Sequence, residues 1–282
     1  MDYLTSETSA RPGARAVRAL AVVILGLLAL DGVAAALVVD GGIRGTAPEG
    51  NAIAIVAKAA GATTSSGSYH MTMSVAADLA GQHVRVRADG VIDTTANLGM
   101  FTLHLPGGHT LELLTDGKTG YLRVRDVSLN LGAQWVSFDG SAFTATTPGI
   151  DPGLDGLGYL RAAAQGAAIE RVGDATIRGV RVAHFHFALP TAQMMANAPA
   201  DLQASAAAAG AVLPATIPCD VWIDGMNRAV RGRVEVELAG SGKIITTVDL
   251  FGFGTPVDFA LPAPKDVISG GTFQNAYDLV TP

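Results

Sequence analysis

The sequence has 282 residues, of which 49% are hydrophobic and 16% charged, and this length suits one domain of about 200–240 residues with an N-terminal extension. Its 34 glycines and 13 prolines indicate many turns rather than long helices. The net charge of −6 argues against binding of nucleic acid through a basic surface, and the single cysteine, Cys219, excludes an intrachain disulfide and a multi-cysteine zinc site.

An apolar segment follows the N-terminal arginines Arg11, Arg15 and Arg18. Residues 19–39 are almost entirely apolar and are long enough to cross the roughly 30 Å hydrocarbon core of a membrane as a helix. Asp31 interrupts this segment past its middle, where the carboxylate can reach the membrane interface. We therefore predict a transmembrane signal-anchor over 19–39.

The same segment can also be interpreted as a signal peptide. Residues 19–30 then form its apolar region, and Ala34-Ala35-Ala36 offers a cleavage site. Both interpretations leave the basic tail, 1–18, in the cytoplasm and the rest of the chain outside it, because positive residues stay inside. We predict a single-pass protein of the cell membrane whose C-terminal domain lies on the extracytoplasmic side, after a linker at 40–47. A buried core helix is a third interpretation, against which the basic flank argues.

The folded domain is predicted to span 48–264 and to begin with a helix over 48–60. Pro48 suits the first turn of this helix and Gly61 its end. Six strands follow, in which apolar and polar residues alternate with a period of two between Gly-rich turns. Such alternation is typical of a sheet with one buried face and one exposed face. The strands are predicted at 69–77, 83–93, 98–105, 109–115, 119–125 and 134–138.

Helices separate the remaining strands. A helix is predicted over 151–165, with Asp151 as its N-cap and Pro152 at its first position. The Ala-rich stretch 191–210 is predicted to form two short helices, because Pro199 breaks the pattern. No strong pattern follows the last strand, so 265–282 is interpreted as a C-terminal tail. The strands of this part are predicted at 168–173, 176–178, 180–189, 216–224, 229–238 and 243–253.

Groups of strands with a few helices between them predict an α+β fold. We expect a highly curved antiparallel sheet of about 11 strands, an open half-barrel wrapped over a few helices. The apolar residues on its inward side are candidates for the lining of a ligand cavity, because methionine and phenylalanine form adaptable apolar walls. The alternative is that the chain's own helices fill this side and leave an ordinary core. The lining candidates are Met71, Met73, Val75, Val84, Val86, Phe101, Leu103, Leu111, Leu113, Val136, Phe138, Phe185 and Phe187.

No catalytic motif is found in the sequence. His184 and His186 share one face of a predicted strand and could meet at one metal ion, but no third ligand is evident nearby. The run 240–243 lacks the first glycine and the hydroxyl residue that a phosphate-binding loop requires. Cys219 has no basic partner close in sequence. We therefore predict that the chain is not an enzyme and holds no metal and no cofactor.

Several short runs occur in a characteristic order along the chain. They are Gly67 to Ser74, Gln134 to Asp139, Leu157 to Arg161, Ile177 to Val180, Ala183 to Phe185, Cys219 to Asp224 and Asp249 to Val257. In this order they resemble the actinobacterial LppX/LprG-like lipoproteins, and the resemblance covers the predicted domain. It implies a LolA/LolB-like fold, an unclosed antiparallel barrel with helices against its concave face. It also implies transport of lipids or lipidated glycans in an apolar cavity, and it supplies no catalytic residues.

One departure from that family concerns the membrane anchor. Its typical member has a lipobox whose cysteine is acylated, whereas Leu37-Val38-Val39-Asp40 contains no cysteine, so we expect the apolar helix to replace the lipid anchor. The predicted function is a membrane-anchored extracytoplasmic lipid-binding or lipid-carrier protein of the cell envelope. Its expected partners are the membrane and a lipid or lipidated glycan, not nucleic acid. The alternative is a non-catalytic sensor or scaffold module, with a helix-filled groove, that binds another envelope protein.

Overall fold

A computed structural model describes most of the domain that follows the N-terminal segment. The described residues are 51–79, 81–104, 110–125, 135–139, 160, 163, 167–191, 213–238, 242–271, 275, 276 and 279. The predicted anchor and linker, and nearly all of the helices expected over 151–165 and 191–210, lie outside them. Within the described residues, no helix combines the length and apolar character needed to span a membrane.

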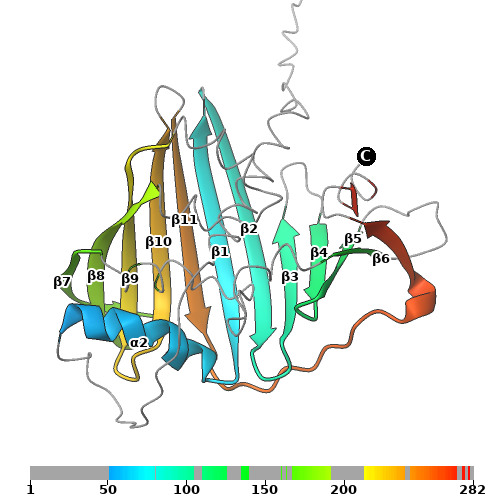
Figure 1. The fold of residues 1–282 in the computed structure, drawn as a ribbon, viewed down its shortest axis with the longest axis horizontal. Coiled ribbons are helices and arrows are strands. Elements are labelled where there is room, and N and C mark those ends of the chain that lie inside the picture. Colours follow the sequence, from blue (N-terminus) through cyan, green and yellow to red (C-terminus); the bar gives the residue numbers. More distant parts are fainter. Residues whose placement is uncertain are drawn as a thin grey trace, which may run out of the picture.

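Twelve strands form one sheet (Figure 1). Strands β1 to β6 form one meander and β7 to β11 a second, and the pairing of β1 with β11 joins the two. The described regular elements are α2 (Ala52–Thr64), β1 (Ser68–Leu79), β2 (Gln82–Asp93), β3 (Leu98–His104), β4 (Thr110–Thr115), β5 (Thr119–Val124), β6 (Trp135–Asp139), β7 (Ile169–Ile177), β8 (Val180–Pro190), β9 (Thr216–Asp224), β10 (Ala229–Leu238), β11 (Gly242–Phe251), the 3-10 helix η1 (Pro264–Asp266) and β12 (Val267–Gly271).

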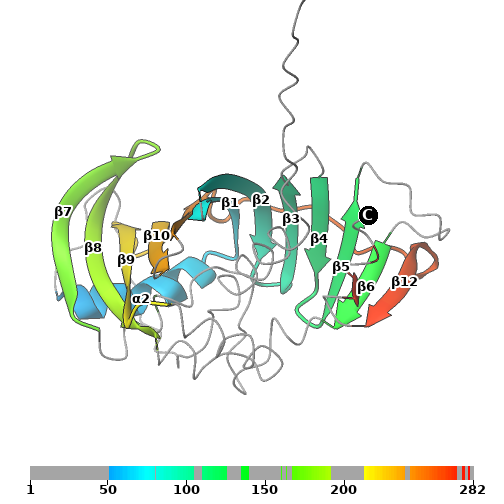
Figure 2. The same cartoon turned by 90° about the horizontal axis from the view of Figure 1, so that it is seen from above.

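The sheet is strongly curved and does not close. Figure 2 shows the bend around β7 and β8 and places α2 on the concave side. Strands β7 and β12 are the two edges of the sheet, so the predicted open half-barrel is confirmed, with twelve strands rather than about 11. The described strand pairs are antiparallel except β12 and β6, which run parallel.

Helix α2 starts later and ends later than predicted. Its N-cap is Asn51, whose side chain accepts a hydrogen bond from a backbone N–H of the first turn, and it continues beyond Gly61. The reason is Thr63, which is buried in the last turn and accepts a hydrogen bond from the backbone N–H of Ala229 at 2.9 Å. This bond attaches the end of the helix to β10, so tertiary contact outweighs the weak helix preference of glycine.

The edge strand β7 is one element where two strands were predicted. A bulge between Arg171 and Gly173 interrupts its pairing with β8, which explains the apparent break in its alternation. The strand carries the charged residues Glu170, Arg171 and Asp174. Charges and bulges of this kind protect an edge from pairing with another chain.

Strand β12 lies within 265–282, for which the sequence predicts no strand. The chain leaves β11 and is fixed beside β1, because Gly254 N–H donates to Ser68 O and Ser68 Oγ donates to Thr255 O. It then runs along one end of the sheet to β6 (Figure 1). The last strand therefore completes the edge of the first meander rather than of the second.

Candidate functional site

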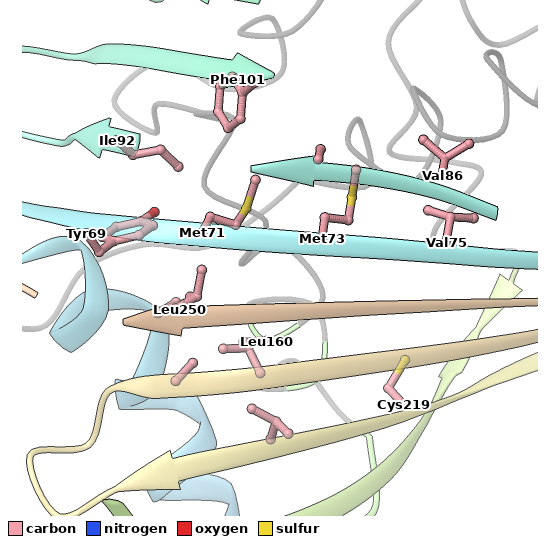
Figure 3. Packing of buried hydrophobic residues seen from close by; sticks show 14 of the residues in the cluster. Tyr69, Met71, Met73, Val75, Val86, Ile92, Phe101, Leu160, Cys219 and Leu250 are labelled. Carbon is pink, nitrogen blue, oxygen red and sulfur yellow. The ribbon is translucent and has the colours of Figure 1, made fainter. Parts of the chain in front are cut away.

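The inward side of the sheet carries every lining candidate predicted from the sequence. All belong to one apolar cluster, and all are buried except Val84 and Leu103, which are partly buried and pack against it. Figure 3 shows Met71, Met73 and Val75 in a row along β1. Strand β2 contributes Val84 and Val86, β3 Phe101 and Leu103, β4 Leu111 and Leu113, β6 Val136 and Phe138, and β8 Phe185 and Phe187. That these side chains contact a ligand stays a prediction.

Two further inward residues follow the same alternation of apolar and polar residues but were not among the predicted lining candidates. Leu122 and Val124 on β5 are buried in the same cluster, so the apolar layer is continuous from β1 to β6. Helix α2 packs mainly against β10 and β7, and Figure 2 shows β3 to β6 beyond its end. Helix α2 therefore covers the concave side mainly over the second meander, β7 to β11. The apolar layer of the first meander continues beyond the end of this helix.

Two phenylalanine rings of this layer lie against glycines. Phe101 is the cross-strand partner of Gly90, and Phe138 is the partner of Gly120. A Cβ atom at Gly90 would lie 2.5 Å from Phe101 Cδ1, and one at Gly120 would overlap the ring of Phe138. The rings therefore occupy the space that a side chain would fill and lie low on the sheet. Sequence reasoning missed these pairs because they depend on strand register.

The outward side of β8 holds the two histidines considered as metal ligands, next to a small second apolar cluster of Ile177, Val182 and Val230. His184 Nε2 and His186 Nδ1 lie 2.9 and 3.0 Å from Oδ1 of Asp220. Asp220 reaches them because β9 pairs with β8, with His186 opposite Asp220. The ring of His184 also stacks on Trp222, at 4.3 Å between centroids. The described residues contain no group of three or more His, Cys, Asp or Glu that could hold a metal ion, so the arrangement is a hydrogen-bonded cluster.

Several arginines on the outward side are paired with carboxylates or stacked on aromatic rings. Glu112 binds Arg123 and Arg125, and Arg123 also lies over the ring of Trp135, at 4.4 Å. Arg231 donates two hydrogen bonds to Asp249, and these bonds raise the pKa of the Arg231 guanidinium. These ion pairs are satisfied within the sheet and favour a structural role.

Cys219 lies on the inward side of β9 and is fully buried. Its thiol donates a weak hydrogen bond to Ile217 O, at 3.6 Å. Burial raises the pKa of the thiol strongly, and the negative charge of Asp220 adds to the shift. A thiol held neutral in this way is a poor nucleophile and a poor metal ligand.

We expect the stability of the folded chain to fall above about pH 9 because of Cys219. The folded pKa of the thiol lies above its ordinary value of 9.0, so its contribution is fully present below pH 9. That contribution is lost as the pH rises towards the folded pKa, by up to about 1.4 kcal/mol per pH unit. Urea unfolding between about pH 8 and pH 10.5 measures this loss, with Cys219→Ala as the control. Identical pH profiles for the two proteins would contradict the prediction.

Comparisons with solved structures identify the fold. No family model and no curated protein matches the chain. The lipoprotein LppX of Mycobacterium tuberculosis is 15% identical, with 74% of this chain and 97% of LppX covered and a TM-score of 0.50. LprF of Mycobacterium bovis is 17% identical, with coverages of 77% and 100% and a TM-score of 0.49. A LolA-superfamily protein of Nitrosomonas europaea is 10% identical, with coverages of 76% and 96% and a TM-score of 0.30.

At this level of identity, the likeness to LppX shows a common fold and nothing finer. LppX is a lipoprotein, and that the present chain is not an enzyme stays a prediction. The open sheet with α2 on its concave side is therefore similar to the fold of LppX, as the sequence resemblance implied.

Proposed function

We propose that the chain is a lipid-binding or lipid-carrier protein of the cell envelope, held at the outer side of the membrane by its N-terminal apolar segment. The ligand is a lipid or lipidated glycan whose acyl chains lie on the inward face of β1 to β6. One observation carries this proposal. The inward apolar layer is continuous across that meander and extends past the main contacts of α2.

The energy available from such a surface is large. Burial of apolar groups contributes about 0.8 kcal/mol per CH₂, so a sixteen-carbon chain gains on the order of 12 kcal/mol before the costs of ordering it. Part of this gain offsets the loss of freedom of the bound chain. An apolar surface can therefore hold acyl chains without recognising a head group.

The low position of the two phenylalanine rings supports the same proposal. Phe101 and Phe138 lie over Gly90 and Gly120 instead of projecting away from the sheet. Their aromatic surface therefore lies close to the strands. An even apolar surface formed by such rings suits flexible hydrocarbon chains, because these chains bind through contact area rather than through a specific pocket shape.

A second candidate function is favoured by the burial of the lining residues. Val136 and Phe185 are fully buried by protein atoms alone. Complete burial is expected where the chain fills its own concave side, as in a sensor or scaffold module. Such a module binds another envelope protein through its outward face.

A labelling experiment separates the two candidates. We expect the full chain, purified in mild detergent, to be labelled by a photoactivatable sixteen-carbon acyl lipid on peptides that contain inward residues of β1 to β6. Leu103→Trp should reduce labelling several-fold, because its larger side chain occupies the inward side. The matched control is Thr102→Trp, whose side chain lies on the opposite face of the same strand. Failure of any lipid to co-purify or label the chain would contradict the carrier proposal and favour the second candidate.

A further inference from the structure

Three large apolar side chains are exposed at one end of the second meander. Ile53 in the first turn of α2 is 48% exposed, Val180 beside the β7–β8 turn is 43% exposed, and Met226 in the β9–β10 turn is 48% exposed. Single exposed apolar residues are ordinary on the surface of a protein. Apolar side chains that gather at one end of a domain indicate instead a surface that binds a partner.

Strand pairing brings the two turns together. Val182 on β8 lies opposite Asp224 on β9, so Val180 and Met226 each lie two residues beyond the same cross-strand pair. Helix α2 packs against β7 and β10, and Figure 1 shows it lying across this end of the strands. Its last turn is bonded to Ala229, directly after the β9–β10 turn. The three segments, 52–64, 177–182 and 224–230, are called the tip surface below.

The β9–β10 turn holds Met226 in its exposed position. The carboxylate of Asp224 accepts hydrogen bonds from the backbone N–H groups of Met226 and Arg228, at 2.9 and 2.8 Å. Asn227 has a φ of 59°, a conformation that asparagine adopts more readily than most residues. The turn is therefore well fixed, and it presents an apolar side chain where polar residues are usual.

The tip surface is basic, although the net charge of the chain is −6. Its one acidic residue, Asp224, is buried and is paired with Arg228 at 2.7 Å. Its other charged residues are Lys58, Arg178 and Arg181. The side chains of Arg178 and Arg181 are 48% and 65% exposed, although each also forms an ion pair with a carboxylate outside the tip surface. Exposed basic side chains around apolar ones favour the anionic head groups of a membrane.

The turns of the first meander at the same end have a different character. Strand pairing places the β2–β3 turn, 93–97, and the β4–β5 turn, 116–118, at this end of the sheet. The first turn contains Asp93 and no basic residue, and neither turn contains a large apolar residue. These turns therefore offer an internal comparison for any role of the tip surface.

The predicted anchor keeps the tip surface close to the membrane. Residues 40–50 separate the end of the apolar segment from Asn51, the N-cap of α2. A chain of that length spans at most about 40 Å when fully extended. Because α2 is itself part of the tip surface, the chain that leads from the predicted anchor enters the domain there.

We propose that the tip surface docks on an anionic membrane surface. Val180 and Met226 enter the boundary between head groups and acyl chains, and Arg178 and Arg181 contact lipid phosphates. Proteins bound in this boundary typically bury their apolar side chains by about 5–10 Å. The inference rests on the proposed function, because it uses the predicted anchor, and it identifies the surface through which the domain approaches the lipids that it binds.

A fluorescent probe tests the docking. Cys219 is the only cysteine and is buried, so a thiol-reactive, environment-sensitive fluorophore labels Met226→Cys selectively. The labelled full chain is incorporated into vesicles of equal parts phosphatidylcholine and the anionic phosphatidylglycerol, with a nitroxide quencher on part of the acyl chains. We expect quenching at position 226 to be several-fold stronger than for Ala96→Cys, an exposed control in the β2–β3 turn. Vesicles of phosphatidylcholine alone should weaken the quenching at position 226, because the arginines then lack anionic partners.

A second measurement follows the transfer of lipid. The double variant Val180→Asp and Met226→Asp should slow delivery of the photoactivatable acyl lipid from vesicles to the chain several-fold. It should leave labelling in detergent unchanged, because both side chains are exposed and lie outside the apolar layer. Equal quenching at positions 226 and 96, or equal quenching at position 226 in the two kinds of vesicle, would overturn the inference. The lipid-carrier function would survive that result if the chain is still labelled in detergent, and loss of this labelling as well would overturn both.

Discussion

Asp224→Ala is expected to lower the free energy of unfolding by about 3–5 kcal/mol, because it leaves a partly buried guanidinium without its partner. The side chain of Asp224 is 3% exposed at the end of β9. Its carboxylate accepts hydrogen bonds from the backbone N–H groups of Met226 and Arg228, at 2.9 and 2.8 Å. It also accepts from Arg228 Nε and Nη2, at 2.9 and 2.7 Å. Urea unfolding of the native and variant chains measures the loss.

The matched control for this variant is Asp174→Ala. Asp174 also pairs with an arginine, since Arg171 donates to it at 2.7 Å and lowers the pKa of its carboxyl. This pair is solvent-exposed on the edge strand, so its loss should leave the free energy of unfolding nearly unchanged. Similar losses for the two variants would contradict the structural role of Asp224. Asp224→Asn should show an intermediate loss, because the amide keeps one acceptor for the turn but removes the charge.

Gly120→Val is expected to destabilise the chain by about 1–3 kcal/mol and to reduce acyl-lipid labelling. The added side chain overlaps the ring of Phe138, which is buried and must move away from the sheet. The displaced ring then projects into the side on which the proposed ligand lies. Urea unfolding measures the first effect and labelling by the photoactivatable lipid measures the second.

A double variant tests whether the ring is the cause. Gly120→Val combined with Phe138→Ala should lose less stability than the sum of the two single variants, because the valine occupies space that the ring has left. The control Gly61→Val, in the exposed part of α2, introduces a Cβ with nothing within 4 Å and should change stability little. Additive losses in the double variant would contradict the contact between Gly120 and Phe138.

Local alternation predicts much of this fold. Met71, Met73 and Val75 recur at every second position, and the structure places them on the buried side, as it does the other lining candidates. The predicted ends of most strands agree with the structure within about two residues, because Gly-rich turns mark them. The sequence of a strand alone thus predicts which of its side chains point inward, because side chains alternate between the two faces whatever the strand pairs with.

Features that depend on the pairing of distant strands were not predictable. Strand β12 is short, ends in two glycines and pairs with β6 from the other end of the domain. Asp220 meets His184 and His186 only because β9 lies beside β8. One sequence carries little information on register, so contacts across strands must come from the structure.

The pairing of β1 with β11 determines the order in which the domain can fold. Each strand from β1 to β6 pairs with its neighbour in sequence, so this meander can form while the rest of the chain is still being synthesised. Strand β1 must then expose one edge, with Met71 and Met73 beside it, until β11 arrives near the end of the chain. Closing such a long loop slows folding, and an unpaired apolar edge favours aggregation in the meantime. We therefore expect that a chaperone acting on this chain protects mainly the unpaired edge of β1 until β11 pairs with it.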